Sequence, residues 1–198
     1  MHKTFERIEK QMDQILFQIH KPNNVYINHD LSVILDRLSI PELSKDAVFS
    51  IYTAMTHLDR ISYFNYDRDA ILIGDLYSAH YYHLIAQIQS THFQKLMSQA
   101  LVHMNALKSN LQQNYKRMSQ AEILESIMNV EMCLLDALID IYELHEDKAR
   151  IRQAIFNKIK VEQLTYLNFY TEEEISQVIQ TLHSKYPKWS GLNEKKSE

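Results

Sequence analysis

The chain has 198 residues, a length that suits one domain with a buried core. It contains 2 glycines and 3 prolines, about a fifth of the number that average composition gives a chain of this length. Between Pro41 and Pro187 there is no proline and a single glycine, Gly74. β-Sandwiches, Rossmann folds and P-loop enzymes depend on glycine in their turns, so the composition excludes them and predicts an all-α fold.

The formal net charge is −4, and acidic and basic residues are intermixed along most of the chain. Only Lys195 and Lys196 form a basic end, so we expect no nucleic-acid partner. Cys133 is the one cysteine, which rules out a disulfide within the chain and suits a reducing compartment. No apolar run approaches the roughly 18 residues of a membrane span, and residues 1–20 lack a signal pattern. We therefore expect a cytoplasmic protein with no integral membrane segment.

The spacing of apolar residues predicts a series of helices joined by short polar links. In chain order we expect helices over about 4–20, 30–38, 41–61, 68–89, 91–115, 123–144 and 172–186, with 64–67 as a link and 146–169 helical around an undefined break. Capping boxes at Ser119–Glu122 and Thr171–Glu174 open two of these helices. We expect one helical domain over 1–189 and a polar tail over 190–198.

The residues alone indicate no convincing catalytic or metal site. No histidine follows a glutamate by three positions, which excludes the usual di-iron bundle motif. His80 and His83 have a spacing that suits one metal ion, although hydrogen-bonded packing is the commoner role of such a pair. Asp136 and Asp140, with Glu143 nearby, resemble an acidic patch, but the solvated edge of an amphipathic helix accounts for them better.

One helix carries a groove of small residues, with Ala70, Gly74 and Ser78 spaced four apart. A glycine inside a helix costs about 1 kcal/mol relative to alanine, so close packing of another helix should offset it. That helix belongs either to this chain's own core or to a partner, and the spacing favours neither alternative. Four residues around the groove end in polar groups: Asp75, Tyr77, Tyr81 and Tyr82. Tyrosines are enriched at protein interfaces.

The run from Gly74 to Ala86, Gly-Asp-Leu-Tyr-Ser-Ala-x-Tyr-Tyr-x-Leu-x-Ala, resembles the signature of component I, the small subunit of bacterial heterodimeric heptaprenyl diphosphate synthase. In the related catalytic trans-prenyltransferases a similar Gly-Asp helix follows a helix that bears His-Asp-Asp-x-x-Asp. The preceding helix here keeps His57 and Asp59 of that motif, while Leu58 and Ser62 replace the other two aspartates. The resemblance implies a helical bundle related to the isoprenoid synthase fold.

The departures from the motif imply that this chain has lost catalysis. The related enzymes hold Mg²⁺ with two aspartate-rich motifs, and Mg²⁺ needs several oxygen ligands in octahedral geometry. Asp59 beside the cationic Arg60 cannot supply half of such a site, and no Asp-Asp-x-x-Asp motif exists in the sequence. We therefore expect no cofactor and no catalytic residue in this chain, and an isolated chain without activity.

The resemblance implies a regulatory subunit that pairs with the catalytic component II, which would carry the Mg²⁺. The heterodimer would make heptaprenyl diphosphate from farnesyl and isopentenyl diphosphates, on the route to the menaquinone side chain. The residues from Ala70 to Tyr82 named above would form the partner interface or the wall of the polyprenyl tunnel. Two alternatives stay open. One is a stand-alone enzyme, a metal- or cofactor-binding helical bundle that uses His80, His83 and the acidic residues, and the other is a helical adaptor unrelated to prenyl chemistry.

Overall fold

The structure is a computed structural model that describes residues 3–18, 25–60, 68–145 and 148–187. Every regular element in these ranges is helical, which confirms the predicted all-α fold. The elements are α1 (Thr4–Gln18), α2 (His29–Arg37), α3 (Glu42–Arg60), α4 (Arg68–Ile88), α5 (Thr91–Asn114), α6 (Gln120–Ile141), α7 (Lys148–Phe156) and α8 (Glu172–Lys185), with 3₁₀ turns η1 (Tyr115–Arg117) and η3 (Val161–Gln163).

Both predicted capping boxes are present and fix the starts of α6 and α8. The Ser119 amide donates to Glu122 at 2.7 Å, and the Glu122 amide donates back to the Ser119 hydroxyl at 3.3 Å. Thr171 and Glu174 form the same pair of bonds before α8. The 146–169 segment is less helical than predicted, since α7 ends at Phe156 and the chain continues through η3 and turns. The predicted 64–67 link and the 190–198 tail lie outside the described residues.

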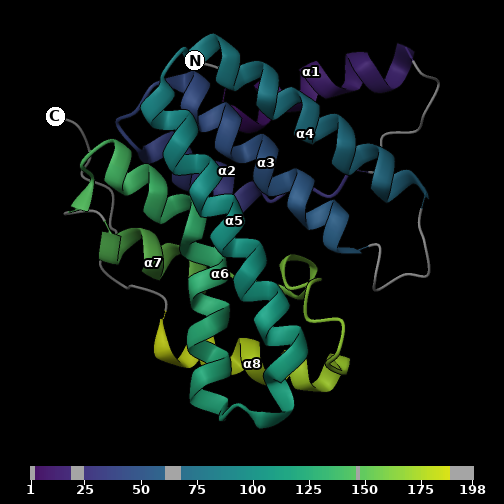
Figure 1. Ribbon diagram of the computed structural model, residues 1–198, viewed down its shortest axis with the longest axis vertical. Coiled ribbons are helices and arrows are strands. Elements are labelled where there is room, and N and C mark those ends of the chain that lie inside the picture. The colour runs from purple at the N-terminus through teal and green to yellow at the C-terminus, as the bar shows by residue number, and fades with distance from the viewer. Residues whose placement is uncertain (1–2, 19–24, 61–67, 146–147, 188–198) are drawn as a thin grey trace, which may run out of the picture.

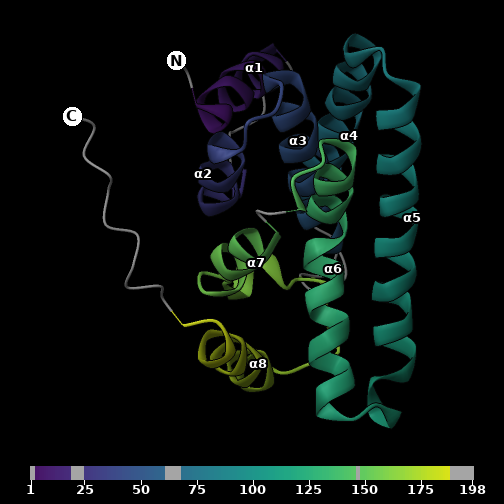
Figure 2. The ribbon, with the colours of Figure 1, turned by 90° about the vertical axis from the view of Figure 1, so that its left-hand side faces the viewer.

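Two helical hairpins form the body of the molecule. α3 packs along α4, and α5 packs along α6 over the whole length of the molecule, as Figures 1 and 2 show. The short helices lie on the other side of α6, with α1 and α2 at one end and α7 and α8 towards the other (Figure 2). Most of α3 is buried, which makes it the central helix of its half.

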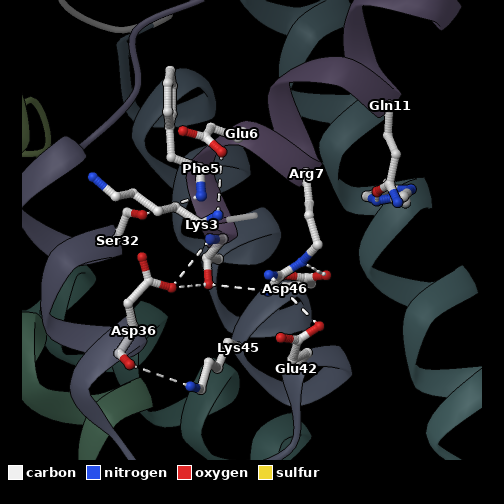
Figure 3. Close-up of polar contacts among 12 residues, drawn as sticks. Lys3, Phe5, Glu6, Arg7, Gln11, Ser32, Asp36, Glu42, Lys45 and Asp46 are labelled. Atoms are coloured by element: carbon white, nitrogen blue, oxygen red, sulfur yellow. Dashed lines mark hydrogen bonds and ion pairs between the residues drawn. The ribbon is translucent and has the colours of Figure 1, made fainter. Parts of the chain in front are cut away.

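α1 packs on α2 and α3 through a buried apolar face, and polar side chains fix the position of its first turns (Figure 3). Asp36 of α2 accepts hydrogen bonds from the amide and the hydroxyl of Thr4, at 3.1 and 2.6 Å. Arg7 grips Asp46 of α3 with its Nε and one terminal nitrogen, at 3.0 and 2.7 Å, and lies 3.7 Å from Glu42. These contacts satisfy first-turn groups of α1 that its own helix cannot pair.

One continuous core joins both hairpins and the shorter helices. Its largest fully buried side chains come from α3, α4, α5 and α7, and they include Phe49, Tyr77, Tyr81, Phe93 and Phe156. Among the described helices, none combines the length and the apolar character that crossing a bilayer requires.

Candidate functional site

The C-terminal end of α3 carries what remains of the aspartate-rich motif. His57 is 1% exposed, and its Nε2 accepts a hydrogen bond from the Tyr26 amide at 3.1 Å. Leu58 turns towards α4, where a Cβ built on Gly74 would lie 2.6 Å from its Cγ. Ser62 lies outside the described residues. The leucine that replaces a motif aspartate therefore packs into the space that the glycine leaves.

The Gly74 contact shows that the small-residue groove of α4 is filled from within the chain. Ala70, Tyr77 and Tyr81 share this inward face and are 4%, 1% and 0% exposed. Asp75 and Tyr82 lie on the opposite face, where Tyr82 is 62% exposed, and Ser78 is half-buried between the two faces. The predicted interface set is thus divided between two faces of one helix, and its role towards a partner or a polyprenyl tail stays a prediction.

Asp59 is neutralised by a lysine from another helix. The Lys108 ammonium of α5 lies 2.5 Å from Asp59 Oδ2, and the two side chains are 11% and 20% exposed. Burial raises the pKa of Asp59 and the charge of Lys108 opposes that rise. The remaining motif carboxylate is therefore engaged in an ion pair within the chain.

A second buried carboxyl lies next to this pair, on α6. Glu131 is 3% exposed and accepts a hydrogen bond from the hydroxyl of Tyr52 on α3. Burial raises the pKa of Glu131 to about 7, against the opposing effects of the Tyr52 hydrogen bond and the Lys108 charge. Burial also holds the pKa of Tyr52 well above its usual value, so the phenol stays protonated and can donate.

These groups enclose a small polar cavity between α3, α5, α6 and the segment that follows η3. Its polar lining consists of Tyr52, Thr56, Asp59, Lys108, Glu131, Gln163 and Tyr166. Its volume of about 20 Å³ fits one water molecule. A diphosphate group with its metal ions needs far more space, so this cavity cannot receive the substrate of a prenyltransferase.

The arrangement offers little chemistry to a substrate. Asp59 is ion-paired, and the buried Glu131 contacts a phenol rather than an open cleft. Burial raises the pKa of Cys133 to about 11, which keeps the thiol protonated and a poor nucleophile. The described cluster therefore holds the helices together and lacks the exposed base, nucleophile or ligand set of an active site.

The histidine pair of α4 is bound to glutamines. His80 Nε2 lies 2.8 Å from Gln11 Oε1, and His83 Nε2 lies 2.7 Å from Gln87 Nε2. Within the described ranges, no three histidine, cysteine, aspartate or glutamate side chains are grouped to hold a metal ion. The metal-binding alternative therefore has no support from the geometry of this part of the chain.

Sequence reasoning singled out Asp59 and missed the other six polar residues that line the cavity: Tyr52, Thr56, Lys108, Glu131, Gln163 and Tyr166. Glu131 did leave a signal, because it is an ionisable residue on the inward face of the least polar helix. The signal for Lys108 is weaker: α5 contains no acidic residue that could pair with it. No local pattern links either residue to Asp59.

The comparisons with known proteins establish the fold and the family. A family model described as hexaprenyl diphosphate synthase, small subunit (HexPS-like), matches residues 2–135. A crystal structure described as heptaprenyl diphosphate synthase from Staphylococcus aureus is similar over 92% of this chain and 97% of that chain. Its sequence identity is 29% and its TM-score is 0.75. No curated protein matches the sequence. The relation to the isoprenoid synthase fold is confirmed, and the chain belongs to the family of hexaprenyl diphosphate synthase small subunits.

Proposed function

We propose that this chain is the non-catalytic, regulatory subunit of a heterodimeric heptaprenyl diphosphate synthase. The heterodimer joins farnesyl and isopentenyl diphosphates, and its product supplies the menaquinone side chain. Membership of a small-subunit family supports the assignment. The observation that carries it is the state of the degenerate motif: Lys108 holds Asp59, and Leu58 occupies the gap at Gly74.

The donors in this chain do not fit the Mg²⁺ that prenyl transfer requires. Mg²⁺ binds through several oxygen ligands at octahedral positions and keeps part of its water shell. In the described part of the motif Asp59 is the one carboxylate, and an ammonium already lies 2.5 Å from it. We therefore assign the Mg²⁺ and both aspartate-rich motifs to the catalytic partner, component II.

The outer face of α4 and α5 is the surface best suited to that partner. From Leu76 to Leu107 the sequence has one Lys, Arg, Asp or Glu residue, Lys95, although such residues make up 23% of the chain. Each of the two helices exposes a large side chain, Tyr82 of α4 at 62% and Val102 of α5 at 71%. Loss of charge together with exposed aromatic and apolar groups is typical of the centre of a protein interface.

Tyr81 and Tyr82, which the resemblance places at the partner interface or the tunnel wall, differ in burial. Tyr81 is fully buried in this chain's core, whereas Tyr82 is exposed. Of the two, only Tyr82 is placed to reach a tail in a tunnel shared with the partner. Longer products from a heterodimer with Tyr82→Ala support that contact, and an unchanged product assigns chain length to the partner alone.

Activity measurements test the central claim. The purified chain, given farnesyl and isopentenyl diphosphates with Mg²⁺, is expected to make no polyprenyl diphosphate. The natural partner to test is a chain with two Asp-Asp-x-x-Asp motifs encoded beside this one, and mixing the two is expected to give synthesis that neither shows alone. Polyprenyl synthesis by this chain by itself contradicts the proposal.

A matched pair of substitutions tests the docking face. Val102→Glu places a charge at the centre of the face and is expected to weaken partner affinity at least about tenfold. Val161→Glu makes the same change at a position that is 40% exposed in η3, away from the face, and should leave affinity unchanged. Isothermal titration with the partner measures both. Equal affinities for the two folded variants place the interface elsewhere.

A further inference from the structure

Lys108 differs from Lys95, the other charged residue of α5, because its side chain points into the protein. Its side chain is 11% exposed, whereas residues on the outer side of the same helix, such as Lys95, Val102 and Asn105, are exposed. A lysine rarely leaves water unless its charge is paired. The groups that surround its ammonium should therefore be those that a cation needs.

Three groups that can bind a cation lie around the cavity that the Lys108 ammonium lines. The Asp59 carboxylate of α3 lies 2.5 Å away, and the centre of the Tyr166 ring lies 5.2 Å away, within the range of a cation–π interaction. The Glu131 carboxyl of α6 lines the same cavity, and Lys108 lowers its pKa against the effect of burial. Among the described residues that line this cavity, Lys108 is the one cation.

We infer that α3, α5 and α6, closed by Tyr166, build a binding site for a primary ammonium cation, and that the chain fills this site with its own Lys108. One end of the site offers a carboxylate and one wall offers an aromatic face, a combination that suits a singly charged organic cation. The cavity next to the ammonium has a volume of about 20 Å³, which is too small for a planar guanidinium. This inference does not depend on the proposed subunit role, because it concerns how the chain binds the ammonium of its own Lys108.

Truncation of Lys108 should leave the site open to a small cation supplied in solution. Lys108→Ala removes Cγ, Cδ, Cε and Nζ, the atoms of n-propylammonium, and leaves a cavity of that shape beside Asp59. n-Propylammonium should bind there and restore stability in a saturable way. Tetramethylammonium cannot donate a hydrogen bond and 1-propanol has no charge, so neither should replace it.

Thermal unfolding of the full chain measures the effect. Lys108→Ala is expected to lower the Tm by about 10 °C, because it leaves the partly buried Asp59 unpaired. n-Propylammonium at ten times its dissociation constant should raise the Tm of that variant by about 4 °C. Neither the wild type nor Lys95→Ala, which removes an exposed lysine from the same helix, should respond. An equal response to all three compounds, or no response to any, overturns the site.

A second pair of variants covers the case in which Lys108→Ala does not fold. Lys108→Met keeps the stem and removes the charge, and adding Asp59→Asn removes the carboxylate that the lysine neutralises. The double variant is expected to be more stable than Lys108→Met alone, by about 5 °C in Tm, because no buried charge is left unpaired. A double variant that is no more stable shows that Asp59 does not need a cation, and this also overturns the site.

Discussion

Each end of α3 pairs an aspartate with a cation from another helix, but the two ion pairs connect different parts of the fold. At the start, Arg7 grips Asp46 with two nitrogens, and Glu42 lies 3.7 Å from the same guanidinium (Figure 3). At the end of α3, Asp59 is the one described carboxylate that lies within ion-pair distance of Lys108. The first pair attaches a peripheral helix, whereas the second joins two central helices beside a third.

The difference lies in what each cation can do when its aspartate is lost. Arg7 is 18% exposed and keeps Glu42 and water as partners. Lys108 is enclosed by the cavity described above and would keep only the Tyr166 ring and the partly protonated Glu131. The ion pair at the end of α3 should therefore contribute more to the free energy of unfolding than the ion pair at its start.

The largest effect is expected from the aspartates themselves. Asp59→Ala leaves Lys108 buried without its counter-ion and should lower the free energy of unfolding by about 4 kcal/mol. Asp46→Ala should cost about 2 kcal/mol, because Arg7 can turn to Glu42 and water. Urea unfolding of the two variants beside the wild type measures both. Equal losses contradict the proposed difference between the two ends.

The next effect concerns pH and the carboxyl of Glu131. Its pKa rises from 4.5 in the unfolded chain to about 7 in the folded one, so the folded state binds the proton more tightly. Stability from this group is then complete below pH 4.5 and is lost as the pH rises through 7, in total about 3 kcal/mol. Tyr52, Asp59, Lys108 and Tyr166 face the group.

Glu131→Gln isolates that contribution. The amide cannot ionise but can still accept the Tyr52 hydrogen bond, while the other titrating groups stay the same in both proteins. The stability of the variant relative to wild type should therefore rise by about 3 kcal/mol between pH 4 and pH 8. Unfolding curves at both pH values measure it. A stability difference that does not vary with pH shows that Glu131 ionises normally in the fold.

The sequence predicts the helices well and the central cluster poorly, for a physical reason. Helix ends depend on local signals, so Ser119 and Glu122 suffice to place the start of α6. The partners of the cluster are distant along the chain: Asp59 and Lys108 are separated by 49 positions, and Tyr52 and Glu131 by 79. Periodicity shows that a side chain points inward, but only tertiary packing decides what it meets.

The Gly74 groove illustrates the same limit within one hairpin. The spacing of Ala70, Gly74 and Ser78 correctly indicates close helix packing, but it does not say which helix approaches. In the structure the approaching helix is α3, through Leu58, which stands in the place of a motif aspartate. The leucine at a motif position and the glycine 16 positions later form one contact, which the spacing of neither segment reveals by itself.

A smaller and more local effect is expected at the start of α1. Asp36→Ala removes the acceptor of both Thr4 hydrogen bonds and should cost about 1.5 kcal/mol, the range of a lost helix cap. Because α1 is peripheral, this loss should appear as local opening. Hydrogen exchange of the α1 amides is expected to accelerate about tenfold, while the α6 amides of the same variant serve as an internal control. Equal acceleration in α6 means that α1 does not open separately.

The smallest net effect is expected at Gly74, where two contributions oppose each other. Alanine at this position gains about 1 kcal/mol of helix propensity. Its Cβ, however, would lie 2.6 Å from both Cγ and Cδ2 of Leu58, and such overpacking typically costs about 1–3 kcal/mol. Gly74→Ala should therefore destabilise the wild type by about 1 kcal/mol.

The sign should reverse once Leu58 is shortened. In a Leu58→Ala background the overpacking disappears and the gain in helix propensity remains, so Gly74→Ala should stabilise by about 1 kcal/mol. A double-mutant cycle on urea unfolding then gives a coupling of about 2 kcal/mol between two residues of one hairpin. The contact between the added Cβ and Ala54 O, at 3.4 Å, is present in both backgrounds, so its energy cancels in the cycle. If Gly74→Ala has the same sign in both backgrounds, Leu58 is not what requires the glycine, and the approach of the α3 backbone to α4 must require it instead.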